Sequence, residues 1–165
     1  MRQIYLGLYG MLFSAVPGIF PTVMAKNGPI IIIEDDEEDE EIFKDILQEL
    51  EISNKIIWFA DPQLAFEYLK KTHEQPFIIF SDVNLPRHSG IELKRNIDAN
   101  EQLREKSIPF IFYSTFVSQE VVNEAYTQMT VQGFFKKGTS YKEIKSDIKL
   151  IVDYWKLCKH PNTEK

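Results

Sequence analysis

The chain has 165 residues, 44% hydrophobic and 27% charged, as in an ordinary soluble globular protein. This length is sufficient for one well-buried domain and too short for two comfortable ones. The formal net charge of −6, with no basic stripe to offset it, argues against general nucleic-acid binding. The single cysteine, Cys158, excludes an internal disulfide, and the three histidines lack the spacing of a zinc site.

Residues 1–28 differ in composition from the rest of the chain. They combine one early Arg with apolar and small residues, followed by Pro, Gly and Asn, which is the outline of a secretory signal. The apolar stretch is too short and too interrupted to span a bilayer well. Two other interpretations remain open: translation starts at Met24, or the segment is an extension that packs on a partner.

From Pro29 onward, short apolar runs alternate with helical patterns. Strands are predicted at 30–33, 55–60, 77–80, 109–113 and 133–136. Apolar spacing and capping residues predict a helix after each strand, ending at Leu50 for the first and then spanning 61–69, 90–100, 118–129 and 141–157. Unbroken apolar strands are typical of a sheet covered on both faces. The pattern predicts an α/β fold with a five-stranded, doubly wound parallel sheet at 29–158 and a polar tail at 159–165.

Polar residues follow directly after four of the predicted strands, where parallel sheets bind their ligands. The first strand runs into eight consecutive acids, "EDDEEDEE". The residues at the four strand ends are Glu34, Asp35 and Asp36; Ser81 and Asp82; Ser114 and Thr115; and Lys136 and Lys137. No glycine-rich phosphate-binding loop accompanies them.

Two explanations fit the acidic run. Acids suit the positive end of a helix dipole, which accounts for residues 37–41. Carboxylates brought together from two strands raise one another's pKa unless a cation neutralises them, and Mg²⁺ prefers oxygen ligands. Glu34 and Asp35 therefore favour a metal site. Taken alone, each strand-end residue also has a plain structural explanation, as a helix-start acid, a turn aspartate, a strand-end hydroxyl or a solvated lysine.

Four segments in order, "IIIIEDD", "FIIFSDVNLPRHSG", "IPFIFYST" and "GFFKKG", resemble the receiver domain of bacterial two-component response regulators. The resemblance covers about 29–158 and includes the pattern D-x-x-[ML]-P-x-x-x-G, from Asp82 to Gly90. It implies the flavodoxin-like receiver fold with strand order 2-1-3-4-5. We expect a stand-alone receiver, and "IVDYWKLC" at 151–158 resembles single-domain receivers partnered with phytochrome-type kinases.

The resemblance implies a phosphoacceptor and a metal site. Asp82 would accept a phosphoryl group from a phosphohistidine. Glu34 and Asp35, with Asp82 and the backbone carbonyl of Asn84, would bind Mg²⁺. The protein would not be an enzyme beyond catalysing its own phosphotransfer and dephosphorylation.

It also implies residues that bind the phosphoryl group. Ser114 would donate a hydrogen bond to it, and Lys137 would pair with one of its oxygens. Thr115 stands where the family often has Ala or Gly, so its bulk would alter phosphotransfer or hydrolysis rates. The family usually has Pro after the lysine, but Gly138 follows here. We expect a trans bond between Lys137 and Gly138, since a cis bond before a non-proline costs about 2.5–4 kcal/mol. Lys136 is the alternative residue to pair with the phosphoryl oxygen.

Phe134 occupies the family's aromatic switch position and would repack the face formed by 118–129, 133–136 and 141–157. The implied partners are a histidine kinase or histidine phosphotransfer protein, a downstream protein, and a second copy bound through that face. Neither nucleic acid nor membrane is expected. We expect a cytoplasmic protein, and for that reason prefer a start at Met24.

Two other functions compete with this one. The first is a receiver-like interaction module that signals without phosphorylation, its charges being structural. The second is a phosphohydrolase with an aspartyl intermediate, which is disfavoured because the usual D-x-D-x-T motif is missing: Asn84 stands two residues after Asp82.

Overall fold

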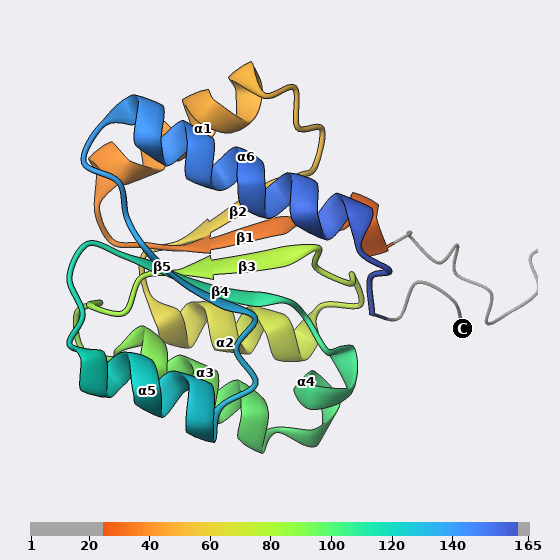
Figure 1. Ribbon diagram of the computed structural model, residues 1–165. Coiled ribbons are helices and arrows are strands. Elements are labelled where there is room, and N and C mark those ends of the chain that lie inside the picture. Colours follow the sequence, from red (N-terminus) through yellow and green to blue (C-terminus); the bar gives the residue numbers. More distant parts are fainter. Residues whose placement is uncertain (1–24, 162–165) are drawn as a thin grey trace, which may run out of the picture.

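Five parallel strands form one sheet in the order β2-β1-β3-β4-β5 in the computed structural model, which describes residues 25–161 (Figure 1). The strands are β1 (Ile30–Ile33), β2 (Ile56–Phe59), β3 (Ile78–Ser81), β4 (Phe110–Ser114) and β5 (Gly133–Lys136). The predicted fold class and strand order are confirmed. The predictions for residues 1–24, including a start at Met24, lie outside the described residues.

Helices cover both faces of the sheet. On one face lie α1 (Glu37–Glu49) and α6 (Tyr141–Leu157), and on the other lie α2 (Pro62–Lys71), α3 (Gly90–Ala99), α4 (Glu101–Lys106) and α5 (Gln119–Gln128) (Figure 1). A short 3-10 helix, Ala25–Asn27, precedes β1. Within residues 25–161, no helix is long and apolar enough to cross a membrane.

The prediction of one helix after each strand missed α4. Asn100 ends α3 with an extended backbone and begins α4, because its side chain accepts a hydrogen bond from the backbone N–H of Leu103 at 3.0 Å. Asn100 therefore ends α3, the helix that was predicted from Gly90, and caps α4, a short helix that was not predicted.

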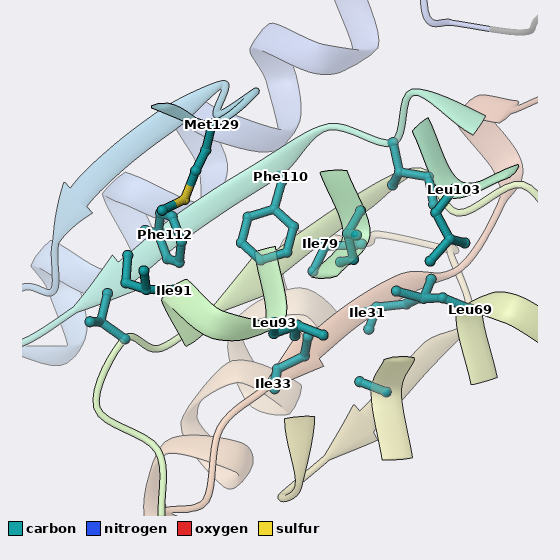
Figure 2. Close-up of a cluster of buried hydrophobic side chains, with 14 of the residues drawn as sticks. Ile31, Ile33, Leu69, Ile79, Ile91, Leu93, Leu103, Phe110, Phe112 and Met129 are labelled. Carbon is teal, nitrogen blue, oxygen red and sulfur yellow. The ribbon is translucent and has the colours of Figure 1, made fainter. Parts of the chain in front are cut away.

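The core has two layers because successive strand residues point to opposite faces. Ile31 and Ile33 pack with α2, α3 and α5, whereas Ile30 and Ile32 pack with α1 and α6. Figure 2 shows the first of these layers. The isoleucines of β1 are at most 1% exposed, so the sheet is a rigid platform for the residues at its carboxyl edge.

Residues 159–161 of the predicted polar tail are described, and His160 among them is buried. Its Nε2 lies 2.7 Å from the carbonyl oxygen of Phe77, and its ring packs near the rings of Phe77 and Trp155. The end of α6 is thereby joined to the start of β3, at the edge of the sheet opposite the polar strand ends.

Candidate functional site

Four buried polar side chains gather at the carboxyl edge of the sheet. The parallel register sets Ile33 beside Ser81 and Ser114 beside Lys136, so the residues that follow each strand meet at one edge. Glu34, Asp82, Ser114 and Lys137 are each at most 9% exposed. Buried charges occur where they are paired or functional, so this cluster is the candidate site.

The carboxylate of Asp82 is fixed through one of its two oxygens. Its Oδ1 accepts hydrogen bonds from the backbone N–H groups of Val83 at 2.6 Å and Asn84 at 3.2 Å, and from the hydroxyl of Ser114. No described residue donates to Oδ2. Because no buried side-chain oxygen among the described residues lacks a partner, Oδ2 retains contact with solvent. Asp82 therefore presents one free oxygen at a fixed position.

Lys137 lies between two acids, Glu34 of the loop after β1 and Asp39 of the first turn of α1. Its Nζ is 2.6 Å from Oε2 of Glu34 and 2.6 Å from Oδ2 of Asp39. Burial alone would lower the pKa of Lys137, but the hydrogen bonds to Asp39 and Glu34 outweigh it and raise the pKa above its usual value. Lys137 is thus held as a cation.

Burial raises the pKa of Glu34 above its usual value, and the nearby charge of Asp82 adds to this, although Lys137 opposes it. The other oxygen of Glu34, Oε1, accepts from the backbone N–H groups of Asp35 at 3.2 Å and Asp36 at 3.4 Å. Asp36 in turn caps α1 by accepting from the backbone N–H of Glu38 at 2.8 Å. The loop after β1 therefore has a fixed path from Glu34 into the helix.

The three acids predicted to share a metal ion do not converge in this structure. Glu34 and Asp82 are close enough for their charges to interact, but Asp35 is exposed and lies with Asn84 along an open groove of about 680 Å³. In the described part of the chain, no three His, Cys, Asp or Glu side chains lie close enough together to hold a metal ion. The oxygen donors suit Mg²⁺ chemically, whereas Lys137 supplies the positive charge beside Glu34 here.

The structure distinguishes the two lysines at the end of β5, Lys136 within the strand and Lys137 after it. Lys137 is buried in the site, while Lys136 is exposed, so Lys137 alone reaches the acids. The bond from Lys137 to Gly138 is trans, as expected. Thr115 is exposed beside the buried Ser114.

Phe134 is half-buried, with its ring centroid 5.1 Å from that of Phe112. Its backbone N–H donates to the hydroxyl of Tyr126 at 2.9 Å, which connects β5 to α5. Phe134 therefore lies at the border between the core and the face formed by α5, β5 and α6.

Two side chains of the site were not found from the sequence. Asp39 is one of eight consecutive acids, and nothing in the run marks it as a partner of Lys137. Asn84 was assigned only a backbone carbonyl, but its side-chain amide donates to Oγ of Ser114 at 3.3 Å and to the carbonyl oxygen of Phe116 at 2.8 Å. This amide joins the loop after β3 to the loop after β4.

Residues 30–149, most of the chain, match the family described as the response regulator receiver domain. The chain belongs to this family. Receiver domains act in two-component signalling, where they interact with histidine kinases and with downstream targets, and they are generally not classical enzymes.

The chain is 27% identical over 131 residues to a probable methanogenesis regulatory protein, FilR2, of Methanothrix harundinacea (strain 6Ac), covering 76% of this chain and 82% of that one. The phosphorylated cyanobacterial phytochrome response regulator RcpA has a similar structure, with a TM-score of 0.73 and 21% identity over 81% of this chain and 98% of that one. The Mn²⁺-bound response regulator Rcp1 gives a TM-score of 0.70 and 23% identity over the same shares. The two structural likenesses bear on the fold.

Proposed function

We propose that this receiver accepts a phosphoryl group from a phosphohistidine onto Asp82, with Mg²⁺, and signals through a repacked protein-binding face. The observation that carries the proposal is the state of Asp82. Its Oδ1 accepts three hydrogen bonds, one of them from the Ser114 hydroxyl, and its Oδ2 remains open to solvent. A carboxylate oxygen is a competent nucleophile for a phosphoryl group.

In the transfer step, Oδ2 attacks the phosphorus atom of the donor. The phosphorus–oxygen bond forms as the phosphorus–nitrogen bond breaks, and the imidazole, protonated at its other ring nitrogen, leaves as a neutral ring. Catalysis of this step consists mainly of positioning and of electrostatic stabilisation of the spread negative charge. The two backbone N–H groups on Oδ1 provide the positioning, and Lys137 provides positive charge within the site.

Mg²⁺ held by Glu34, Asp35, Asp82 and the backbone carbonyl of Asn84 would neutralise negative charge on the transferring group. The donor set supports this assignment, because all four ligands offer oxygen atoms. Binding requires the exposed side chain of Asp35 to turn toward Asp82. A divalent ion is also present in the similar structure of Rcp1, which was solved in its Mn²⁺-bound form.

The phosphorylated site would signal through Ser114 and Phe134. Phosphorylation adds a charge of about −1.5 to −2 and three strong acceptors. The hydroxyl of Ser114 would leave Oδ1 of Asp82 for a phosphoryl oxygen, which strains the amide bridge from Asn84. Phe134 would then repack against Phe112. Because Phe134 has no hydroxyl that could form a hydrogen bond in the unphosphorylated or the phosphorylated state, only its packing would differ between them.

The face of α5, β5 and α6 is the proposed binding surface for a downstream protein or a second copy. Leu150, Tyr154 and Leu157 of α6 are 58–87% exposed and recur at helical spacing, so they form an apolar stripe on this helix. The proposed setting is the cytoplasm, where phosphohistidine donors draw on ATP.

Intact mass tests the proposal. Incubation with acetyl phosphate and Mg²⁺ should add one phosphoryl group, and omission of Mg²⁺ should prevent the addition. Asp82→Asn should abolish it, whereas Asp45→Asn, an exposed aspartate of α1, should behave like the wild type. Addition that persists in Asp82→Asn would contradict the assignment.

A receiver that signals without phosphorylation is the second candidate. The pairing of Lys137 with Glu34 and Asp39 favours it, because the buried Glu34 already has a cationic partner without an added ion. This candidate predicts no mass increase with any small phosphodonor, and no beryllofluoride binding in the presence of Mg²⁺.

A further inference from the structure

Asp39 of α1 reaches the candidate site from outside the predicted set of residues. It lies in the first turn of the helix, and its Oδ2 is 2.6 Å from Nζ of Lys137. The Lys137 side chain is only 4% exposed, so Asp39 forms one wall of an enclosed cation site. Among the described residues, Lys137 forms ion pairs with Asp39 and Glu34 and none with Asp82.

The two acids differ in how readily they would release the lysine. The side chain of Glu34 is 5% exposed, so without Lys137 it would be a buried charge without its ion-pair partner, which is strongly unfavourable. The side chain of Asp39 is 23% exposed and can exchange the lysine for water at lower cost. If Lys137 is to pair with a new anion on Asp82, Asp39 is the partner that gives way.

We propose that Asp39 is a positioning residue that holds Lys137 back from Asp82 and so limits how readily the site accepts a phosphoryl group. The inference rests on the proposed function, since it assumes that Lys137 pairs with the group on Asp82. Asp39 stabilises the unmodified arrangement and competes with the phosphoryl oxygens for the same ammonium group.

A purely structural role is the alternative, in which Asp39 only fastens α1 to the end of β5. The two roles predict opposite signs for binding. Loss of a structural contact would leave anion binding unchanged or weaken it. Loss of a competitor for Lys137 would strengthen anion binding even though the protein becomes less stable.

The test is the affinity of the full chain for beryllofluoride, measured by calorimetry at saturating Mg²⁺. Asp39→Asn should bind roughly five- to tenfold more tightly than the wild type, which lies within the range of coupling energies for residues that share one charge network. Its thermal midpoint should fall. Glu38→Gln is the matched control, because it removes one charge from the same helical turn at an exposed residue that has no contact with Lys137.

A double-mutant cycle tests whether Asp39 changes the affinity for beryllofluoride through Lys137. In a Lys137→Ala background, Asp39→Asn should give no gain in affinity, since the competition acts through the lysine. A gain of the same size there would mean a direct effect of charge on the anion and would overturn the proposal. So would an affinity of Asp39→Asn no higher than that of Glu38→Gln. Asp39→Ser is a second neutral variant, so the comparison does not depend on the folding of one protein.

Failure of the proposed function gives a different result. If the wild type does not bind beryllofluoride, or binds it equally well as Asp82→Asn, the phosphoacceptor assignment is wrong. If the wild type binds and Asp82→Asn does not, the assignment stands and the Asp39 comparison alone decides this inference.

Discussion

Alanine in place of Gly90 tests whether α3 fixes the position of Asp82. A methyl group at this position would lie 2.0 Å from the carbonyl oxygen of Asp82 and 2.8 Å from Oγ of Ser81. Ordinary contact begins at 3.4 Å, so the helix and the Asp82 carbonyl would have to separate by about 1.4 Å. The backbone of Gly90 is not in the left-handed region. The site therefore requires the absence of a side chain, and not a special conformation.

Two opposing energies set the expected change. Alanine gains up to about 1 kcal/mol over glycine in helix propensity. Crowding in a packed interior costs about 1–3 kcal/mol, and here the obstacle is backbone, which yields less easily than a side chain. We expect the free energy of unfolding to fall by about 1–2 kcal/mol. A displacement of about 1 Å at a reacting group can cost about 100-fold in rate, so phosphorylation of Asp82 should slow strongly.

Urea unfolding followed by circular dichroism measures the first effect, and intact mass after timed exposure to acetyl phosphate measures the second. Asn96→Ala, at an exposed position of the same helix, is the control and should change neither quantity appreciably. If Gly90→Ala is as stable as the wild type and is phosphorylated at the same rate, α3 does not hold the Asp82 carbonyl as inferred.

Two further substitutions and one change of pH test the fold outside the site. Glu51→Gly should raise the free energy of unfolding by about 1 kcal/mol, because Glu51 has a left-handed backbone with φ of 53°. Lys94→Ala should lower it by about 3 kcal/mol, because the buried Nζ binds Asp98 at 2.7 Å and Thr130 at 2.8 Å. Although burial opposes it, hydrogen bonds from Lys94 and Thr130 hold the pKa of Asp98 below its ordinary value of 3.8. The stabilisation by the Asp98 carboxylate is therefore complete above that pH and is lost as the pH falls below it.

Urea unfolding checks all three, each against its own control. Glu51→Ala keeps a side chain at the strained position and should not gain stability. Lys149→Ala removes an exposed lysine four residues from Asp153, a pair of the same spacing as the buried one, and should cost about 0.5 kcal/mol or less. For the acid effect, Asp98→Asn should be less stable than the wild type at pH 7, and the difference should shrink by pH 3. A difference that is constant with pH would contradict the depressed pKa.

The fold was predictable because short segments of the sequence, read one at a time, indicate its strands and most of its helices. Unbroken apolar runs such as that at 30–33 indicate strands buried on both faces, and parallel strands bring their carboxyl ends to one edge. That reasoning correctly gathered Asp82, Ser114 and Lys137 at one edge of the sheet. The helix α4 was missed because a single Asn100 caps two helices, and apolar periodicity does not detect so short an element.

The detailed pairing within the site was beyond the sequence. Which acid of α1 meets Lys137 depends on where that helix starts, and the cap at Asp36 sets that start. Asp35 is exposed on the same loop, where its backbone N–H donates to Glu34. The bridge by the side chain of Asn84 depends on the separation of two loops that no sequence spacing encodes.

The two layers of the core hold neighbouring side chains of β5 on opposite faces of the sheet. Phe134 packs with the layer shared by α2, α3 and α5, whereas its neighbour Phe135 packs with the layer of α1 and α6. A rearrangement around Phe134 can therefore spread across one side of the sheet while the opposite side keeps its shape. Substitutions in the layer beneath α5 can therefore change how Phe134 packs without altering the layer beneath α1 and α6.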